Sequence, residues 1–142
     1  MLCRDVGAHM LSKPIPDPIS SQKRRGSIIN IASHLSFQGG LNVPDLKSGI
    51  VWLTKGLSIE WAAHGITVNA IAPGYIATDM NTTLMEDEER AEAILKKIPA
   101  GRWGRPEDFQ AAVVFLAGAG SGYVSGEVVT VDGGWTARED RG

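Results

Sequence analysis

The chain has 142 residues, of which 43% are hydrophobic and 21% are charged, a composition that excludes disordered and fibrous proteins. Its formal net charge of −2 offers no attraction to nucleic acid or to anionic lipid, and no apolar run has membrane-spanning length. The single cysteine, Cys3, cannot form an internal disulfide, and Arg4 and Asp5 interrupt the apolar stretch that a signal peptide would need. We therefore expect a soluble, cytoplasmic protein that binds neither nucleic acid nor membrane.

The amino-terminal third predicts a helix, a loop and a strand. Residues 1–12 carry apolar side chains near helical spacing. Residues 13–26 contain three prolines and end in a basic cluster, residues 23–25, which we interpret as part of a surface loop. Residues 27–32 (SIINIA) form a nearly continuous apolar run, which is typical of a strand buried on both faces of a parallel sheet.

A helix and a second strand follow. Residues 48–63 place four large apolar side chains on one helical face, and Gly65 is a typical stop signal. Residues 66–72 (ITVNAIA) predict another buried strand, which Pro73 and Gly74 end.

The last third predicts two helices and a third strand. Residues 86–98 begin with acidic and end with basic side chains, which suits a helix dipole. Pro106 is typical of a first helical turn, and apolar spacing continues that helix to residue 116. Residues 118–122 form a helix–strand connection, and residues 128–131 form the third strand. Strands that alternate with helices predict an α/β fold with a mostly parallel sheet.

Ligands of open α/β sheets bind beyond the carboxyl ends of the strands, which selects residues 33–47, 73–80 and 133–135. Ser33 can be a binding group or an ordinary strand-end cap. Lys47 can be a functional cation or an ordinary surface lysine of a first helical turn. His34 has an unperturbed pKa near 6.5, as a general base would need.

Several stretches together resemble the short-chain dehydrogenase/reductase family. They are INIASHLSFQGG, KSGIVWLTKGLSIEWAAHGITVNAIAPGYIATDM, IPAGRWGRPEDF and VDGGW, spread over residues 26–137. The segments SFQGG, AGRWG and GGW are most similar to branches that oxidise sugar acids and polyols, of the gluconate and deoxygluconate type.

The resemblance implies a Rossmann-like doubly wound parallel sheet, of which this chain would hold the carboxyl-terminal half, with about three strands. It implies NAD or NADP as cofactor and a Ser–Tyr–Lys catalytic group. Ser33 would hydrogen-bond the substrate oxygen, and Lys47 would contact the nicotinamide ribose and lower the pKa of the tyrosine. The residues that would lie against the nicotinamide are Pro73, Gly74, Ile76 and Thr78. The family gives His34 no role in proton transfer.

The chain departs from this family in two ways. The family motif is Tyr-x-x-x-Lys, but about three residues are missing between Pro44 and Lys47, and the two tyrosines, Tyr75 and Tyr123, stand elsewhere. The amino-terminal half, which carries the glycine-rich phosphate turn, is also absent. We therefore expect residues 1–142 to be a partial domain, with a loop at 13–26 and a family-matching core at 27–137.

These departures leave three hypotheses. The chain can belong to an NAD(P)-dependent oxidoreductase of a sugar acid or polyol, with the missing half supplied by a longer protein or a second polypeptide. It can instead be a non-catalytic interaction module that forms a homo-oligomer or pairs with a full-length relative through residues 48–63 and 133–135. It can also be a degenerate copy or an incomplete gene product. In each case we expect the chain alone to be inactive.

Overall fold

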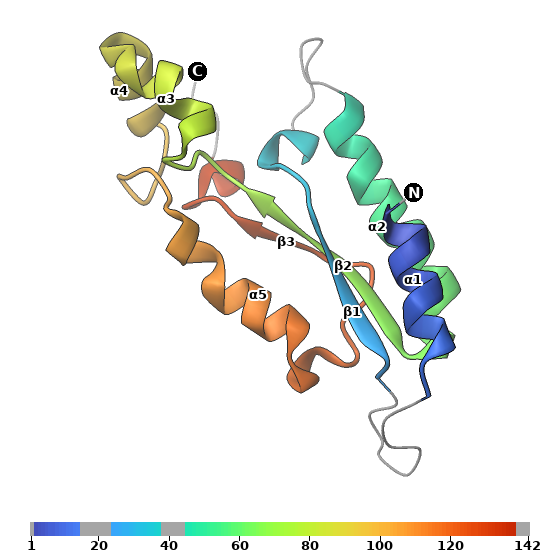
Figure 1. Ribbon diagram of the computed structural model, residues 1–142. Coiled ribbons are helices and arrows are strands. Elements are labelled where there is room, and N and C mark those ends of the chain that lie inside the picture. Colours follow the sequence, from blue (N-terminus) through green and yellow to red (C-terminus); the bar gives the residue numbers. More distant parts are fainter. Residues whose placement is uncertain (1, 15–23, 38–44, 139–142) are drawn as a thin grey trace.

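A parallel sheet forms the centre of the protein (Figure 1). The computed structural model describes residues 2–14, 24–37 and 45–138, with residues 45–47 described by their backbone alone. Within these ranges the sheet has three strands in the order β1 (Gly26–Ile31), β2 (Ile66–Pro73) and β3 (Val128–Val131). All neighbours are parallel, with Gly26 opposite Ile66 and Ala70 opposite Val128. The three predicted strands are confirmed to within one residue at each end.

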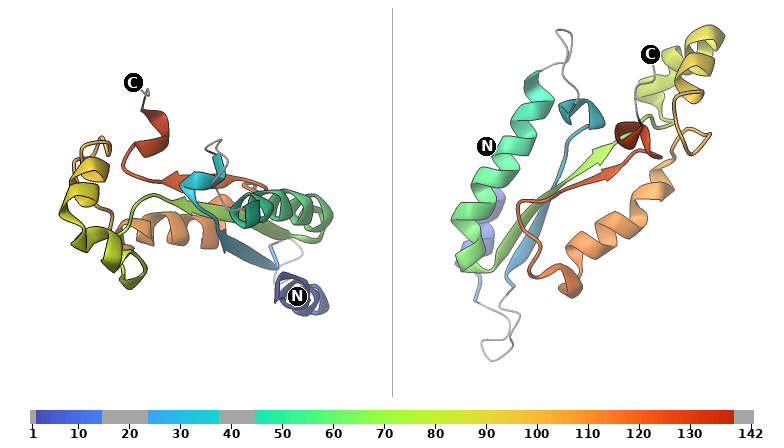
Figure 2. Two further views of the ribbon diagram at one scale, coloured as in Figure 1. Left: turned by 90° about the horizontal axis from the view of Figure 1, so that it is seen from above. Right: turned by 180° about the vertical axis from the view of Figure 1, so that it is seen from behind.

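Helices cover both faces of this sheet, as the views in Figures 1 and 2 show. Helices α1 (Leu2–Ser12) and α2 (Asp45–Trp61) lie on one face, and α5 (Gln110–Ala117) lies on the other. The short helices α3 (Thr82–Glu86) and α4 (Glu88–Leu95) follow β2 near the carboxyl ends of the strands. This two-sided cover of parallel strands is the doubly wound arrangement that the sequence predicts.

The core lies mainly between the sheet and helices α1 and α2. The central strand β2 is buried from Ile66 to Ala72, because it has a neighbouring strand on each side and helices on both faces. Trp61 at the end of α2 packs with Ile28, Ile66 and Val68, and apolar residues of α1 close over this cluster. Burying a large apolar side chain contributes roughly 1.5–3 kcal/mol, so this cluster fixes the position of α1.

Two predicted helices have different bounds in the structure. The helix predicted at 48–63 begins at Asp45 and gives way after Trp61 to a 3-10 turn, Ala62–His64. Gly65 then ends it in the left-handed conformation at φ 77°, as predicted. The helix predicted at 86–98 is α4, which runs from Glu88 to Leu95, and the short helix α3 before it, which ends at Glu86, was not predicted. Asp87 is extended, and its carboxylate accepts a hydrogen bond from the Arg90 N–H at 3.1 Å, so it starts α4 as an N-cap.

Two arginines of the basic cluster, Arg24 and Arg25, contact the fold instead of lying free in a surface loop. Arg24 donates to the carbonyl oxygens of Leu116 (2.5 Å) and Gly118, and to the Thr67 hydroxyl at 3.1 Å. Arg25 donates to the carbonyl oxygen of Leu11 at 2.8 Å. Burial lowers the pKa of Arg24, although a guanidinium remains charged. The two arginines thus join α1 and α5 to the amino end of the sheet.

The four tryptophans occupy different environments. Trp61 and Trp135 are buried, and Trp103 is half-buried. Trp52, however, points outward from α2 with 73% of its surface exposed. His9 and His64 are exposed on the protein surface. Among the described helices, none is both long enough and apolar enough to cross a bilayer.

Candidate functional site

The three strand ends selected from the sequence meet at one edge of the sheet. The His34 ring lies 2.8 Å from the Pro73 carbonyl oxygen through its Nδ1 atom. The N–H of Gly74 donates to the carbonyl oxygen of Val131 at 3.0 Å, and the His34 and Trp135 rings are 5.8 Å apart. The turns after β1, β2 and β3 are therefore in direct contact, so the three stretches selected from the sequence lie together at this edge.

Ser33 lies where β1 ends, and it is buried, with 5% of its surface exposed. Its hydroxyl oxygen accepts a hydrogen bond from the Leu35 N–H at 3.3 Å, so it caps the 3-10 turn His34–Phe37. This local capping role was one of the two sequence interpretations. It uses an acceptor lone pair of the hydroxyl, and the O–H group is a separate donor, so capping is compatible with donation to a ligand.

Lys47 lies in the first turn of α2. Its side chain is outside the described part of the structure, and so are residues 38–44, which link the Ser33 turn to this helix. The predicted contact of Lys47 with a cofactor therefore stays a prediction.

The segment after β2 is held on its far side by the loop at residues 100–105. The N–H of Ala77 donates to the Gly104 carbonyl oxygen, and the N–H of Gly104 donates to the Tyr75 carbonyl oxygen, both at 2.9 Å. Ile76 is buried in this bridge. Thr78 is exposed, and Pro73 and Gly74 are half-buried.

Gly74 has a structural reason to be glycine. A Cβ atom there would lie 2.6 Å from the Asp132 Cα atom, well inside van der Waals contact. The family resemblance assigns Gly74 to the segment that would lie against the nicotinamide. In the structure the close approach is between β2 and the turn after β3, so Gly74 first serves the packing of the two strand ends.

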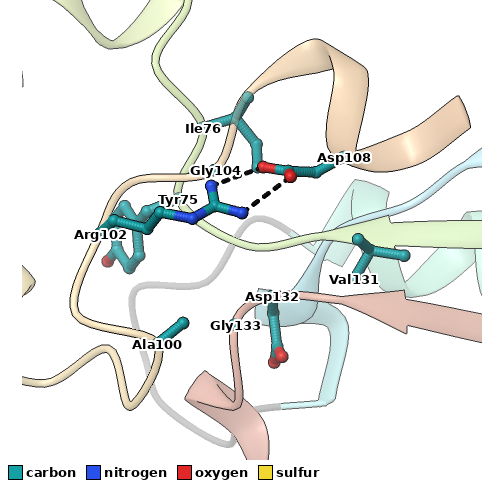
Figure 3. Close-up of a pocket in the computed structure, with 9 residues that line it drawn as sticks. All are labelled: Tyr75, Ile76, Ala100, Arg102, Gly104, Asp108, Val131, Asp132 and Gly133. Atoms are coloured by element: carbon teal, nitrogen blue, oxygen red, sulfur yellow. Dashed lines mark hydrogen bonds and ion pairs between the residues drawn. The ribbon is translucent and has the colours of Figure 1, made fainter.

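A pocket of about 240 Å³ opens beside this segment (Figure 3). Its lining residues are Tyr75, Ile76, Ala100, Arg102, Gly104, Asp108, Val131, Asp132 and Gly133. Arg102 and Asp108 form a bidentate ion pair, with N···O distances of 2.7 and 2.8 Å. The Arg102 guanidinium and the Arg105 backbone N–H hold the pKa of Asp108 well below its usual range.

Asp132 is the second carboxylate of this pocket. Burial raises the pKa of Asp132, but hydrogen bonds from Thr136 and Gly134 and the nearby His34 ring outweigh burial, so the pKa lies below its ordinary value. Its oxygens accept from the Gly134 N–H at 2.9 Å, the Thr136 N–H at 2.8 Å and the Thr136 hydroxyl at 2.7 Å. Both carboxylates are thus ionised acceptors that close turns, and neither resembles a proton donor poised near neutral pH.

Aromatic rings pack behind the pocket. The Tyr75 ring lies 4.7 Å from Trp135, 5.0 Å from His34 and 5.7 Å from Trp103, measured between ring centroids. Arg102 and Asp108 lie outside the three stretches selected from the sequence, and Tyr75, although it lies within 73–80, was given no role there. Arg102 and Asp108 are six residues apart across a turn, a spacing that no regular element predicts. In the described ranges, no group of His, Cys, Asp or Glu side chains could hold a metal ion.

These observations place the protein in the class of doubly wound α/β folds. A doubly wound parallel sheet carries its polar turns at the carboxyl ends of the strands, which is where such folds bind nucleotide cofactors and their substrates.

Comparison with known proteins identifies the family. A family model described as Enoyl-(Acyl carrier protein) reductase matches residues 7–136. The chain is 50% identical over 131 residues to the 2-dehydro-3-deoxy-D-gluconate 5-dehydrogenase of Dickeya dadantii, covering 90% of this chain and 52% of the relative. It is 49% identical over 141 residues to the enzyme of that name from Bacillus subtilis, covering 97% and 52%. The chain belongs to the short-chain dehydrogenase/reductase family.

Solved structures agree with this assignment. A gluconate 5-dehydrogenase from Burkholderia cenocepacia, in complex with NADP and tartrate, superposes with a TM-score of 0.84 at 34% identity, covering 97% of this chain and 51% of that one. A short-chain type dehydrogenase/reductase from Mycobacterium marinum superposes with a TM-score of 0.79 at 30% identity, covering 96% and 51%. The chain spans about half the length of the curated relatives described above.

Proposed function

We propose that this chain is part of an NAD(P)-dependent oxidoreductase that interconverts a hydroxyl and a carbonyl on a sugar acid or polyol. The observation that carries the proposal is the contact between the Ser33 turn and the Pro73–Gly74 segment at the carboxyl edge of the sheet. Sugar-acid dehydrogenases among its relatives support the substrate class. The domain would comprise residues 1–142, with its family-matching core at 27–137.

The residues present suit the nicotinamide end of the cofactor. Pro73 is half-buried and Thr78 is exposed, so this segment offers an apolar ring surface and a hydroxyl to a ligand above the sheet edge. Gly74 and Ile76 shape the segment through their contacts with Asp132 and Gly104. A phosphate-binding turn would have to come from outside the core at 27–137.

Each site residue has one role in this proposal. Ser33 donates its hydroxyl proton to the substrate oxygen, while its acceptor lone pair keeps the Leu35 N–H. Lys47 would contact the nicotinamide ribose from the first turn of α2. A bound nicotinamide supplies or accepts the hydride.

The group that would exchange a proton with the substrate oxygen is missing from its family position. Leu46 and Asp45 precede Lys47, and no phenol stands in the Tyr-x-x-x-Lys position. Tyr75 packs between aromatic rings, and Tyr123 is fully exposed in the loop before β3. Because loss of a general acid costs roughly 10²- to 10⁴-fold in rate, we expect the chain alone to turn over little or no substrate.

Cofactor binding tests the proposal directly. NADP and NAD are titrated into the purified chain while tryptophan fluorescence is followed, since Trp135 and Trp103 flank Tyr75. A saturable change that Thr78→Val weakens supports the proposal. The matched control is Thr83→Val, which alters an equally exposed threonine in α3, outside the segment. No saturable change with either cofactor would contradict the proposal.

The exposed face of α2 favours a second candidate function, an interaction module. Trp52 and Ile59 are 73% and 81% exposed and lie seven residues apart on one side of the helix. Gly49 and Gly56, on the same side, have open space around them. When two copies pair about a twofold axis, the large side chains of each copy can fit into the open glycine positions of the other. We therefore propose a second copy of the chain as the partner, with a full-length relative as the alternative.

A further inference from the structure

One side-chain hydrogen bond connects the turn after β1 to the turn after β2. The backbone ladder between these strands ends with the Ala32 N–H, which donates to the Ile71 carbonyl oxygen at 2.8 Å. Two residues later, the Pro73 carbonyl oxygen lies 2.8 Å from the His34 Nδ1 atom. The imidazole therefore continues the strand pairing past the point where the backbone ladder stops.

The chemistry of this contact fixes the proton on the ring. A carbonyl oxygen only accepts hydrogen bonds, so Nδ1 must carry the hydrogen. His34 is 3% exposed, and its ring packs against Tyr75 and Trp135 at 5.0 and 5.8 Å. The donor is thus held in place by the two turns that follow β2 and β3.

We propose that His34 is a positioning residue, which holds the Pro73–Thr78 segment against the Ser33 turn through its Nδ1–H···O=C hydrogen bond to Pro73. The role in catalysis rests on the proposed function, because the held segment is the one assigned to the nicotinamide. His34 neither touches the reacting atoms nor transfers a proton in this role.

Among the described residues, the backbone hydrogen bonds of Gly74 and Ala77 hold the segment from the side opposite to β1, so we expect its position relative to the β1 turn to depend on His34. Gly74 and Ala77 are bonded to β3 and to the 100–105 loop through Val131 and Gly104. His34 is the contact from the β1 side, where Ser33 lies. If the Pro73 carbonyl loses its donor, we expect the segment to open at residues 74–77 while the strand pairing below it persists.

Two substitutions separate the effect of the hydrogen bond from the effect of the ring's volume. His34→Leu introduces an apolar side chain of similar size and removes the Nδ1–H donor. His34→Asn places an amide N–H near the position of Nδ1 and can restore the hydrogen bond. His64→Leu is the control, since it removes an exposed histidine at the amino end of the sheet.

Amide hydrogen exchange measures the effect without any ligand. We expect His34→Leu to speed exchange of the Gly74 and Ala77 amides by about tenfold, as loss of a partner from a polar group implies. The Ala70 and Gly126 amides, bonded at the other end of β2, serve as internal references and should not change. His34→Asn should restore the wild-type rates. Equal acceleration at all four amides, no acceleration, or failure of Asn to rescue would overturn the proposal.

Nitrogen-15 spectra of the histidine rings give a second, independent readout. The signal that disappears in His34→Asn belongs to His34, and it should show a hydrogen on Nδ1. An unprotonated Nδ1 would show that His34 does not donate a hydrogen bond to the Pro73 carbonyl oxygen, which would overturn the proposal.

NADP titration then tests whether the hydrogen bond from His34 to Pro73 affects cofactor binding. We expect His34→Leu to weaken NADP binding about fivefold or more, and His34→Asn and His64→Leu to leave it near wild type. Unchanged NADP affinity in His34→Leu would overturn the positioning role. A wild-type chain without any NADP response contradicts the proposed function, and hydrogen exchange still decides whether His34 holds the segment.

Discussion

Asp132 shows how a single side chain closes the edge where the strands end. Its two oxygens accept three hydrogen bonds from the turn that follows β3, and its backbone contacts Gly74 closely enough to exclude a Cβ atom. Because each of these hydrogen bonds favours the ionised form, the pKa of Asp132 lies below its ordinary value despite partial burial. Its contribution to stability therefore depends on pH.

We predict that Asp132→Asn lowers the melting temperature at pH 7 by about 2–5 °C, because it weakens hydrogen bonds to a charged acceptor. A depressed pKa stabilises the fold fully above the unfolded value of about 3.9, and this contribution is lost as the pH falls through the folded pKa. The difference between wild type and variant should therefore shrink below about pH 4. Thermal melts from pH 7 to pH 3 measure it.

The control for this prediction is Asp5→Asn, which alters an exposed carboxylate whose ion-pair partner is its neighbour Arg4. Surface ion pairs contribute little, so its melting temperature should stay close to wild type at every pH. A difference for Asp132→Asn that is equally large at pH 3 and pH 7 would contradict the assigned role of its charge.

At the scale of elements, glycines within helices have opposite roles in α1 and α2. A Cβ atom on Gly7 would lie 2.7 Å from the Cζ2 atom of Trp61, so α1 reaches its place against the core because residue 7 has no side chain. Gly56, in the middle of α2, has no atom within 4 Å of the position of its Cβ. Both glycines weaken the helix by their backbone freedom, but only Gly7 permits a close contact.

We predict that the same substitution at these two sites changes stability in opposite directions. Gly7→Ala should lower the free energy of unfolding by about 1–2 kcal/mol, because overpacking against Trp61 exceeds the gain in helix propensity. Gly56→Ala should raise it by about 0.5–1 kcal/mol when both are measured at a concentration where the chain is monomeric, because its Cβ would then act through helix propensity alone. Urea unfolding curves measure both. Stabilisation by Gly7→Ala would show that α1 does not pack on Trp61 as described.

At the scale of the whole molecule, the helix faces not covered by the rest of the chain decide how it behaves in solution. On α2, Trp52 and Ile59 form an apolar stripe with Gly49 and Gly56 beside them. Exposed apolar patches of this kind are typical of protein–protein interfaces.

We predict that the wild-type chain self-associates and that the double variant Trp52→Glu, Ile59→Glu shifts it to monomer, because buried charges oppose the pairing of α2 with its copy. Sedimentation velocity over a concentration series measures the shift, which should exceed tenfold in dissociation constant. Met80→Glu, a similarly exposed position at the carboxyl edge, should leave association unchanged. A wild-type chain that is monomeric at all concentrations would contradict the interaction-module proposal.

Local patterns in the sequence predict the three strands, most of the helices and the edge that carries the candidate site. The run 66–72 is mostly apolar because β2 is buried on both faces, and the strand end at Pro73 follows from the missing N–H of proline. Gly65 marks the end of the preceding helix because its backbone is left-handed. Each of these signals depends on a few neighbouring residues, and the parallel order of the strands follows from the helices between them.

Which residues distant in the sequence come into contact can be seen only in the folded structure. Arg24 looks like part of a surface cluster in sequence, yet it bonds residues more than ninety positions away. The helix predicted at 86–98 begins at Glu88, because the carboxylate of Asp87 caps its first turn, and the separate short helix before it was not predicted. The contact of His34 with Pro73, 39 positions along the chain, depends on the register of β1 against β2. Periodicity predicts that two strands are buried, whereas their register, set by packing over the whole sheet, decides which side chains face each other beyond their ends.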